Sequence, residues 1–238
     1  MPASLVRSPS NRMTDVLTFM AVFTAFAGVL IAVVFLVRRY QQKLEGERTL
    51  GLKSAATLLG WQFTEEVPLD YLPNLFSFAL FSEGHSKQIK NLITGERNGV
   101  KAAFFDYNYT DGHGKHSHTY YQSVAYFEPR DLSLPYFSLR PEGVLHKVIT
   151  AFGYQDIDFI NRPVFSDQYL LRGTGETAIR NTFSDELLAF YEANPGMSRD
   201  GGGNQLFIFR QSYRTPPHEV VAFVEGAAGL QSIYSRRR

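Results

Sequence analysis

The sequence has no cysteine among its 238 residues. A chain without cysteine forms no disulfide, and it offers no thiolate ligand for a structural zinc site. Exported domains often use disulfides, so the absence of cysteine favours a reducing compartment for the folded part of this chain.

The chain also has almost no net charge. Its 24 lysine and arginine residues and its 23 aspartate and glutamate residues give a formal charge of +1. Proteins that bind nucleic acid through the phosphate backbone show a basic surface. The near-neutral balance therefore argues against nucleic acid as a partner.

The familiar catalytic fingerprints are missing as well. The sequence has no Gly-x-Ser-x-Gly turn, no His-Glu-x-x-His helix and no dinucleotide-binding glycine pattern. The run Gly201-Gly202-Gly203 lacks the lysine of a phosphate-binding loop and precedes a strand, so we interpret it as a hairpin or flexible loop. The sequence thus predicts no catalytic residue and no cofactor.

A long apolar run stands out near the N-terminus. No charged residue interrupts residues 16–37, which read VLTFMAVFTAFAGVLIAVVFLV. A helix of this length reaches roughly 33 Å, enough to cross a hydrocarbon core of ~30 Å. The run is longer than the apolar core of a secretory signal, and Arg38 and Arg39 follow it in place of a cleavage site. We predict an uncleaved transmembrane helix, with a cleaved signal and a buried core helix as the alternatives.

The charges on either side of this run predict its orientation. Arg7 and Arg12 precede it, whereas a larger basic group follows it: Arg38, Arg39, Lys43, Arg48 and Lys53. The side that is richer in lysine and arginine stays in the cytoplasm. We therefore predict a single-pass protein of the plasma (inner) membrane, with its N-terminus outside and its folded domain in the cytoplasm.

Small residues share one face of the predicted membrane helix. They are Ala21, Ala25, Gly28 and Ala32. Such a face lets two membrane helices approach closely, although glycine is also common in spans that do not associate. The expected partners are therefore the lipid bilayer around residues 16–37 and, through this face, a second copy of the chain.

Composition divides the chain into four parts. The hydrophobic fraction of 44% and the aromatic fraction of 14% are typical of a folded protein. Gly46 and Gly51 weaken the helix that follows the span and make a candidate hinge. The expected parts are a disordered tail (1–15), a transmembrane helix (16–37), a juxtamembrane linker (38–47) and a soluble α+β domain (48–238).

The clearest signal inside the domain is a β-hairpin. The pair Asn98-Gly99 lies between strand-like runs at 89–97 and 100–109, and both turn positions of such a hairpin need a positive φ. A third run at 118–127 completes an antiparallel meander, and 134–139 predicts a fourth strand. The fold class we expect is α+β, a mostly antiparallel sheet with packed helices.

The rest of the domain alternates between helical and extended patterns. Residues 75–81 fit either a buried strand or a short helix, and residues 154–167 look irregular. Helices are predicted at 48–59, 144–152, 176–182, 185–193 and after Thr215, and short strands at 61–63, 168–172 and 205–211.

Three stretches carry a resemblance. They are FDYNY at 105–109, LPYFSLRPE at 134–142 and YLLRG at 169–173. Together they resemble a group of uncharacterised bacterial membrane-anchored proteins, over most of the soluble domain. The resemblance implies a bacterial inner-membrane setting and adds no catalytic residue.

The sharpest chemical pattern is a histidine-rich loop. Residues 111–118 read DGHGKHSH, and His113, His116 and His118 are three of the six histidines of the chain. Imidazoles at this spacing are candidate ligands for zinc or copper, with Asp111 as an oxygen donor. The alternative is a solvated hairpin loop, because glycine and polar residues are typical of such loops.

Three further acidic residues are candidates for chemistry. Asp106 lies in an apolar strand, where it could transfer protons or, as a structural residue, hydrogen-bond to a neighbouring strand or pair with an arginine such as Arg140 or Arg172. Asp156 and Asp158 could act as paired catalytic acids, but their alternation with apolar residues is more typical of a loop that enters a strand.

These patterns favour a binding or interaction module for a protein or small ligand at the cytoplasmic face of a membrane. The competing hypothesis is a membrane-tethered enzyme, metal-assisted through His113, His116 and His118.

Overall fold

The computed structural model of this chain describes residues 9–143 and 156–235. The chain divides into two compact units, Met1–Arg48 and Thr49–Arg238. We describe each unit by itself.

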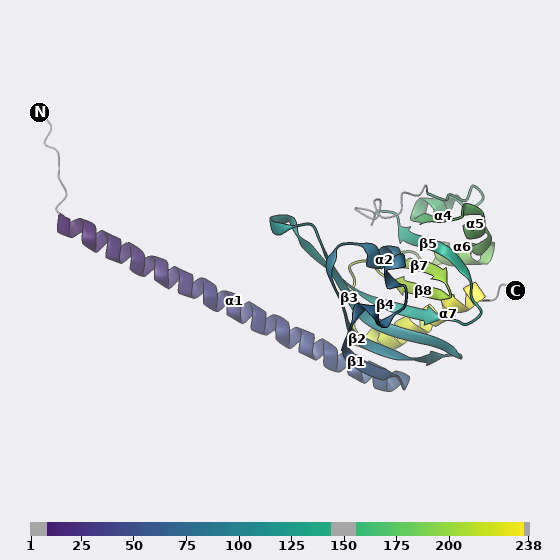
Figure 1. Ribbon diagram of the computed structural model, residues 1–238, viewed down its shortest axis with the longest axis horizontal. Helices are drawn as coiled ribbons and strands as arrows, with labels where there is room; N and C mark the ends of the chain where they lie inside the picture. The colour runs from purple at the N-terminus through teal and green to yellow at the C-terminus, as the bar shows by residue number, and fades with distance from the viewer. Residues whose placement is uncertain (1–8, 144–155, 236–238) are drawn as a thin grey trace, which may run out of the picture. The chain divides into compact units, whose positions relative to one another are not determined.

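The first unit contains most of a long helix, α1 (Pro9–Leu59) (Figure 1). Within α1, Leu17–Leu59 is long and apolar enough to cross a membrane, judged by length and composition. The apolar anchor that the sequence predicted is therefore present as a helix. The helix continues through the linker 38–47, and it begins at Pro9, within the tail that we expected to be disordered.

The last part of α1 belongs to the second unit, where Leu52, Ala55 and Ala56 are buried. Gly51, which we predicted to form a hinge with Gly46, is helical. A Cβ added to Gly51 would meet the Pro217 ring at 2.7 Å. Gly51 thus permits close packing in the second unit. Gly60, with φ of +70°, ends the helix as predicted.

The second unit is built on one antiparallel sheet, which has eight strands in the described part of the chain. Its spatial order is β1-β2-β3-β4-β8-β7-β5-β6. The strands are β1 (Gln62–Val67), β2 (His85–Arg97), β3 (Val100–Asp111), β4 (His118–Glu128), β5 (Leu134–Pro141), β6 (Tyr169–Gly173), β7 (Ser198–Gly203) and β8 (Gln205–Phe209). The expected α+β fold class is confirmed.

The predicted hairpin and meander are confirmed too. Arg97 pairs with Val100 across Asn98 and Gly99, whose φ angles of +53° and +75° are those of a tight hairpin turn. β3 then pairs with β4 from Lys101 to Asp111. The fourth strand, β5, also forms, but β8 and β7 lie between it and β4.

In the described part of the chain, short segments cover one face of the sheet. The aromatic side chains of Phe105, Tyr107 and Tyr109, which alternate along β3, are all buried there. The segment 69–82 covers them with two 3-10 turns, η1 (Leu69–Tyr71) and η2 (Leu75–Ser77), and a single-turn helix, α2 (Ala79–Ser82). The ambiguous run at 75–81 is therefore helical.

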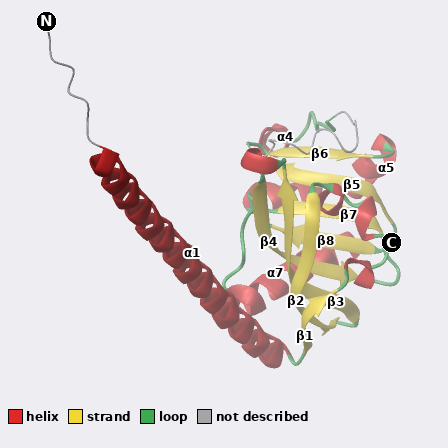
Figure 2. Cartoon of the chain, turned by 60° about the vertical axis from the view of Figure 1, so that its left-hand side comes forward, coloured by secondary structure: helices red, strands yellow, loops and turns green. Residues whose placement is uncertain are grey.

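The opposite face packs against α7 (Val220–Ser235) and a group of shorter helices. These are α4 (Pro163–Gln168), α5 (Glu176–Thr182) and α6 (Asp185–Ala193), and Figures 1 and 2 show α4 and α5 at the β5–β6 end of the sheet. The last helix, α7, which we predicted after Thr215, buries Val220, Val224, Ala227, Leu230 and Tyr234, and Phe223 is partly buried.

Three further expectations for the domain can be compared with the structure. The glycine run belongs to the β7–β8 hairpin, in which Gly202 pairs with Gln205, so the hairpin alternative is confirmed and the flexible loop is not. A Cβ on Gly201 or Gly202 would meet the rings of Phe137 or Tyr136 at 2.4 or 2.5 Å. The stretch 154–167, expected to be irregular, contains the start of α4. The helix expected at 144–152 lies outside the described residues.

Candidate functional site

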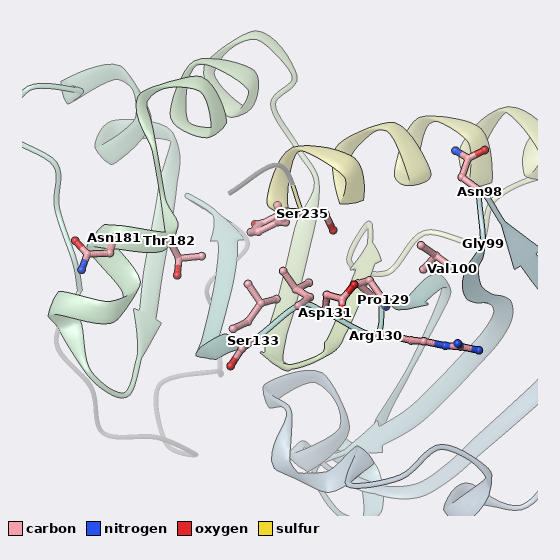
Figure 3. A pocket seen from close by; sticks show the side chains of 13 residues that line it. Asn98, Gly99, Val100, Pro129, Arg130, Asp131, Ser133, Asn181, Thr182 and Ser235 are labelled. Carbon is pink, nitrogen blue, oxygen red and sulfur yellow. The ribbon is translucent and has the colours of Figure 1, made fainter. Parts of the chain in front are cut away.

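A groove of about 730 Å³ opens in the second unit where four chain segments meet (Figure 3). They are the β2–β3 turn, the β4–β5 loop, the end of α5 and the end of α7. The described residues that line it are Asn98, Gly99, Val100, Pro129, Arg130, Asp131, Leu132, Ser133, Leu134, Asn181, Thr182, Tyr234 and Ser235.

The fold fixes each wall of this groove. The left-handed turn at Asn98 and Gly99 sets the first wall. Leu134, which opens β5, is buried in the main core and anchors the β4–β5 loop. The Tyr234 ring stacks on Phe137 with centroids 6.1 Å apart, and its hydroxyl hydrogen-bonds that of Tyr191. The walls are therefore tied to the core rather than to mobile surface loops.

The lining chemistry suits binding. Hydroxyl groups of Ser133, Thr182 and Ser235 and the amides of Asn98 and Asn181 line the groove with one cation, Arg130, and one carboxylate, Asp131. Among these described lining residues there is no histidine or lysine. Sequence reasoning missed this groove, because its walls come from segments far apart along the chain.

The three loop histidines lie at the tip of the β3–β4 hairpin. His113 precedes the 3-10 turn η3 (Gly114–His116), His116 ends it, and His118 opens β4; all three are exposed. The ring of His118 contacts Tyr120 edge-on, with centroids 4.6 Å apart.

A fourth histidine, His85 at the start of β2, lies beside the hairpin tip, and the sequence pattern did not include it. The His85 ring lies 5.3 Å from that of His113, and its Nε2 is 3.0 Å from the carbonyl oxygen of Gly112. No group of three or more metal-binding side chains converges anywhere in the described residues. A metal site at His113, His116 and His118 stays a prediction.

Asp106 is a buried structural hub. Its carboxylate accepts hydrogen bonds from Asn91 Nδ2 at 3.0 Å and Ser123 Oγ at 2.9 Å, and it pairs with Arg214 at 3.3 Å. We expected a structural pairing with Arg140 or Arg172, but a loop arginine near the C-terminus supplies it. Asn91 in turn accepts from Thr49 Oγ1 at 2.9 Å, so the network reaches α1.

Arg140 pairs instead with Asp200, which lies on the adjacent strand β7. The Arg140 guanidinium donates twice to the Asp200 carboxylate, at 2.6 and 3.1 Å, and both side chains are almost fully buried. Asp200 Oδ2 also accepts from the backbone N–H of Leu80 at 2.7 Å. This pair therefore joins β5, β7 and the α2 cover.

Glu83, which follows α2, contacts the face of the sheet that carries the aromatic side chains of β3. Its carboxylate accepts a hydrogen bond from the Tyr109 hydroxyl at 2.8 Å. Burial raises the pKa of Glu83, an effect that the nearby Arg140 charge partly offsets. Burial, with the Glu83 charge, also raises the pKa of Tyr107 and of Tyr109.

Asp156 is bound to the backbone of two segments, whereas Asp158 is exposed. Asp156 Oδ1 accepts from the backbone N–H groups of Ile157 and Leu171, at 3.0 and 2.9 Å, and so ties the segment before α4 to β6. Burial raises the pKa of Asp156. Residues 156–159 form a loop, as the alternating pattern predicted, but a turn and α4 follow it where we expected a strand.

The small-residue face of the anchor is exposed in this single chain. Ala21, Ala25, Gly28 and Ala32 are all open, and a Cβ on Gly28 would meet nothing within 4 Å. Self-association through these four residues stays a prediction.

No protein-family model and no curated protein matches the sequence. Among solved structures, the crystal structure of the mycobacterial trehalose monomycolate transport factor A, TtfA, is similar. The sequence identity is 14% and the TM-score 0.56, over 80% of this chain and 92% of the other. At this identity the similarity concerns the fold alone.

Proposed function

We propose that this chain is a membrane-anchored binding module of the bacterial inner membrane, related to the group suggested by the FDYNY, LPYFSLRPE and YLLRG stretches. Residues 16–37 hold it in the bilayer, and the domain works at the cytoplasmic face as an accessory to membrane transport. The proposal rests on one observation: an apolar helix long enough to cross a membrane precedes a domain whose fold is similar to that of a transport factor.

The charge distribution around the span supports the orientation. Two arginines precede the apolar run and five basic residues follow it within sixteen positions, from Arg38 to Lys53. Positive charge is retained on the cytoplasmic side during insertion. The absence of cysteine from the whole chain agrees with a reducing compartment.

The chemistry of the domain supports binding over catalysis. Two ion pairs with buried carboxylates, Asp106 with Arg214 and Asp200 with Arg140, hold strands, the α2 cover and loops together. The groove of Figure 3 offers hydrogen-bonding hydroxyl and amide groups beside an apolar floor. A module of this kind acts by holding a partner or ligand at the membrane.

A reporter fusion tests the orientation. We expect a green fluorescent protein fused after Arg238 to be fluorescent, because it stays in the cytoplasm, and an export-dependent phosphatase at the same position to be inactive. Replacing Arg38, Arg39 and Lys43 by glutamine while adding three lysines before residue 16 is the matched inversion control. Phosphatase activity in the unaltered chain would reverse the orientation.

Chemical cross-linking in intact cells tests the accessory role. We expect the full chain to cross-link to an integral membrane transport protein. A chimera that keeps residues 1–48 but carries an unrelated soluble domain should lose that product, because the anchor alone does not recognise the partner. Equal cross-linking by the full chain and the chimera would assign the contact to the span and contradict a binding domain.

A further inference from the structure

We propose that the groove of Figure 3 binds an uncharged, polyhydroxylated molecule, either a free sugar or the sugar headgroup of a lipid. This site goes beyond the partner-binding role, and it does not depend on any protein partner. Four features of the groove carry the assignment: its polar groups, the helix ends beside it, its apolar floor and its balance of charge.

The polar groups around the groove match the hydroxyls of a sugar. Side-chain hydroxyls (Ser133, Thr182, Ser235) and amides (Asn98, Asn181) both donate and accept, as each sugar hydroxyl does. Figure 3 shows Thr182, Ser133, Asp131 and Ser235 on walls that come from separate segments, while the Asn181 amide points away from them. Asp131 adds a carboxylate to this lining, and hydrogen bonds to a carboxylate are stronger than those to a neutral oxygen.

Helix ends beside the groove add further acceptors. Both α5 and α7 end there, at Thr182 and Ser235, and the last turn of a helix presents backbone carbonyls. In α5 the carbonyl of Thr182 accepts from Ser184 N–H at 3.2 Å, which leaves it a second lone pair. A ligand that is rich in O–H donors satisfies such a surface, whereas an anion is repelled by the negative ends of two helices.

The floor of the groove is apolar and fixed. Leu134 and Tyr234 belong to the main buried core, and Val100 and Leu132 pack against that core. Sugar rings carry C–H faces that pack on such surfaces while their hydroxyls point to the polar walls. The volume of about 730 Å³ is within the roughly 300–1,000 Å³ range of small-molecule sites.

The charge balance favours a neutral ligand. Arg130 and Asp131 are adjacent and of opposite sign, so the lining has no excess charge among its described residues.

Sugar binding by the full chain tests the proposal, in a detergent without a sugar headgroup. The probe is maltose, followed by saturation-transfer NMR and calorimetry. We expect saturable binding, and we expect Ser133→Trp to lower the affinity at least about tenfold by filling the groove. Ser117→Trp, at another exposed serine in the β3–β4 hairpin, is the matched control and should leave it unchanged.

A second variant that fills the groove from another wall guards against the possibility that the first variant simply misfolds. Ser235→Trp should also lower maltose affinity at least about tenfold, with each variant keeping the melting temperature of the unaltered chain. Monomeric dodecyl maltoside distinguishes the two sources of the ligand. Equal affinity for it and for maltose identifies a free sugar, and at least about tenfold tighter binding identifies a lipid headgroup.

Several results would overturn the proposal. One is the absence of saturable maltose and dodecyl maltoside binding by the folded chain. Another is maltose binding that survives both tryptophan variants. A third is a groove that prefers inorganic phosphate or an alkylammonium ion to maltose. None of these results would affect the cross-linking test of the accessory role, so the two proposals fail separately.

Discussion

The Asp200 carboxylate connects three elements through one side chain. It receives the Arg140 guanidinium from β5 and the Leu80 N–H from α2, while its own strand, β7, lies between β5 and β8. The guanidinium also lies over the Phe209 ring, 4.8 Å from its centroid. A buried charge with so many partners becomes costly once its counter-ion is lost.

Replacing Asp200 by alanine is therefore expected to lower the free energy of unfolding by about 3–5 kcal/mol, because it leaves Arg140 charged, buried and without its counter-ion. Denaturant unfolding followed by the fluorescence of Trp61, the single tryptophan, measures this change. Glu66→Ala, at an exposed pair with Lys90, is the control and should change stability by less than about 1 kcal/mol. Equal costs for the two variants would refute a structural role for the buried pair.

Glu83 is expected to make stability depend on pH. Its folded pKa is raised above the usual 4.5, so the folded state holds this proton more tightly than the unfolded state. The stabilisation that this proton gives is complete below the unfolded pKa and is lost as pH rises through the folded pKa. Glu83→Gln should therefore raise stability at neutral pH and flatten its decline with pH above 4.5.

The measurement is the denaturation midpoint of the unaltered chain and of Glu83→Gln at a series of pH values. Glu66→Gln, at an exposed carboxylate, serves as the control and should keep the pH dependence of the unaltered chain. An unchanged slope in Glu83→Gln would show that the burial of this carboxyl does not favour its protonated form.

Among the elements, those defined by local patterns could be predicted from the sequence. Asn98-Gly99 specifies its turn by backbone sterics, and Ser184 caps α6 by accepting from Leu187 N–H at 3.3 Å. The β7 strand could not be predicted, because glycine has a low strand propensity. Gly201 and Gly202 fit this strand because the rings of Phe137 and Tyr136, contributed by β5, lie directly over them. The place of β7 depends on long-range packing.

The same distinction explains the candidate sites. The histidine loop is visible in the sequence because its residues are consecutive, whereas the groove joins segments near residues 98, 131, 181 and 235. The partner of Asp106 was missed because Arg214 lies more than a hundred positions away. The spacing of residues in the sequence predicts local geometry only, whereas the groove and the Asp106–Arg214 pair depend on the order of the strands in the sheet.

The β3–β4 hairpin tip gives a prediction that separates the two function classes. If His113, His116 and His118 belong to a solvated loop, replacing all three by serine should shift stability by less than about 0.5 kcal/mol. Saturating zinc or copper should then leave the melting temperature of the unaltered chain unchanged. We expect this result, because a metal would have to order an exposed glycine-containing loop.

A native metal site would behave differently. A hundredfold excess of metal over its Kd would stabilise the unaltered chain by about 2.7 kcal/mol, and the triple variant would lose that gain. His85→Ser is an informative addition, because the His85 ring lies beside His113. A metal-dependent rise in melting temperature that these substitutions abolish would favour the metal-assisted enzyme over the binding module.

At the scale of the whole molecule, the second unit is expected to fold without the bilayer. A fragment of residues 47–238 keeps Leu52, Ala55 and Ala56, which pack with Ile93 and Val224. It should be monomeric in water with a cooperative thermal transition. The matched fragment 61–238 lacks this contribution from α1 and should be less stable by at least about 2 kcal/mol, the lower bound for losing one buried leucine.

Circular dichroism and denaturant titration of both fragments measure the difference. A fragment 47–238 that aggregates or needs detergent would show that the domain core includes part of the anchor or a partner. Equal stability of the two fragments would mean that the α1 segment adds nothing to the core.

The strand order has a consequence for synthesis on the ribosome. β4 lies in the middle of the finished sheet, but its neighbour β8 is made much later, since Val124 pairs with Phe209. At roughly 5–20 residues per second, the nascent chain carries β1 to β4 with an open apolar edge for several seconds. During that interval the edge is a template for pairing with other chains. Ribosome pausing between β4 and β8 would prolong this exposure, so the yield of folded protein should respond to codon choice in that interval more than in the segment after β8.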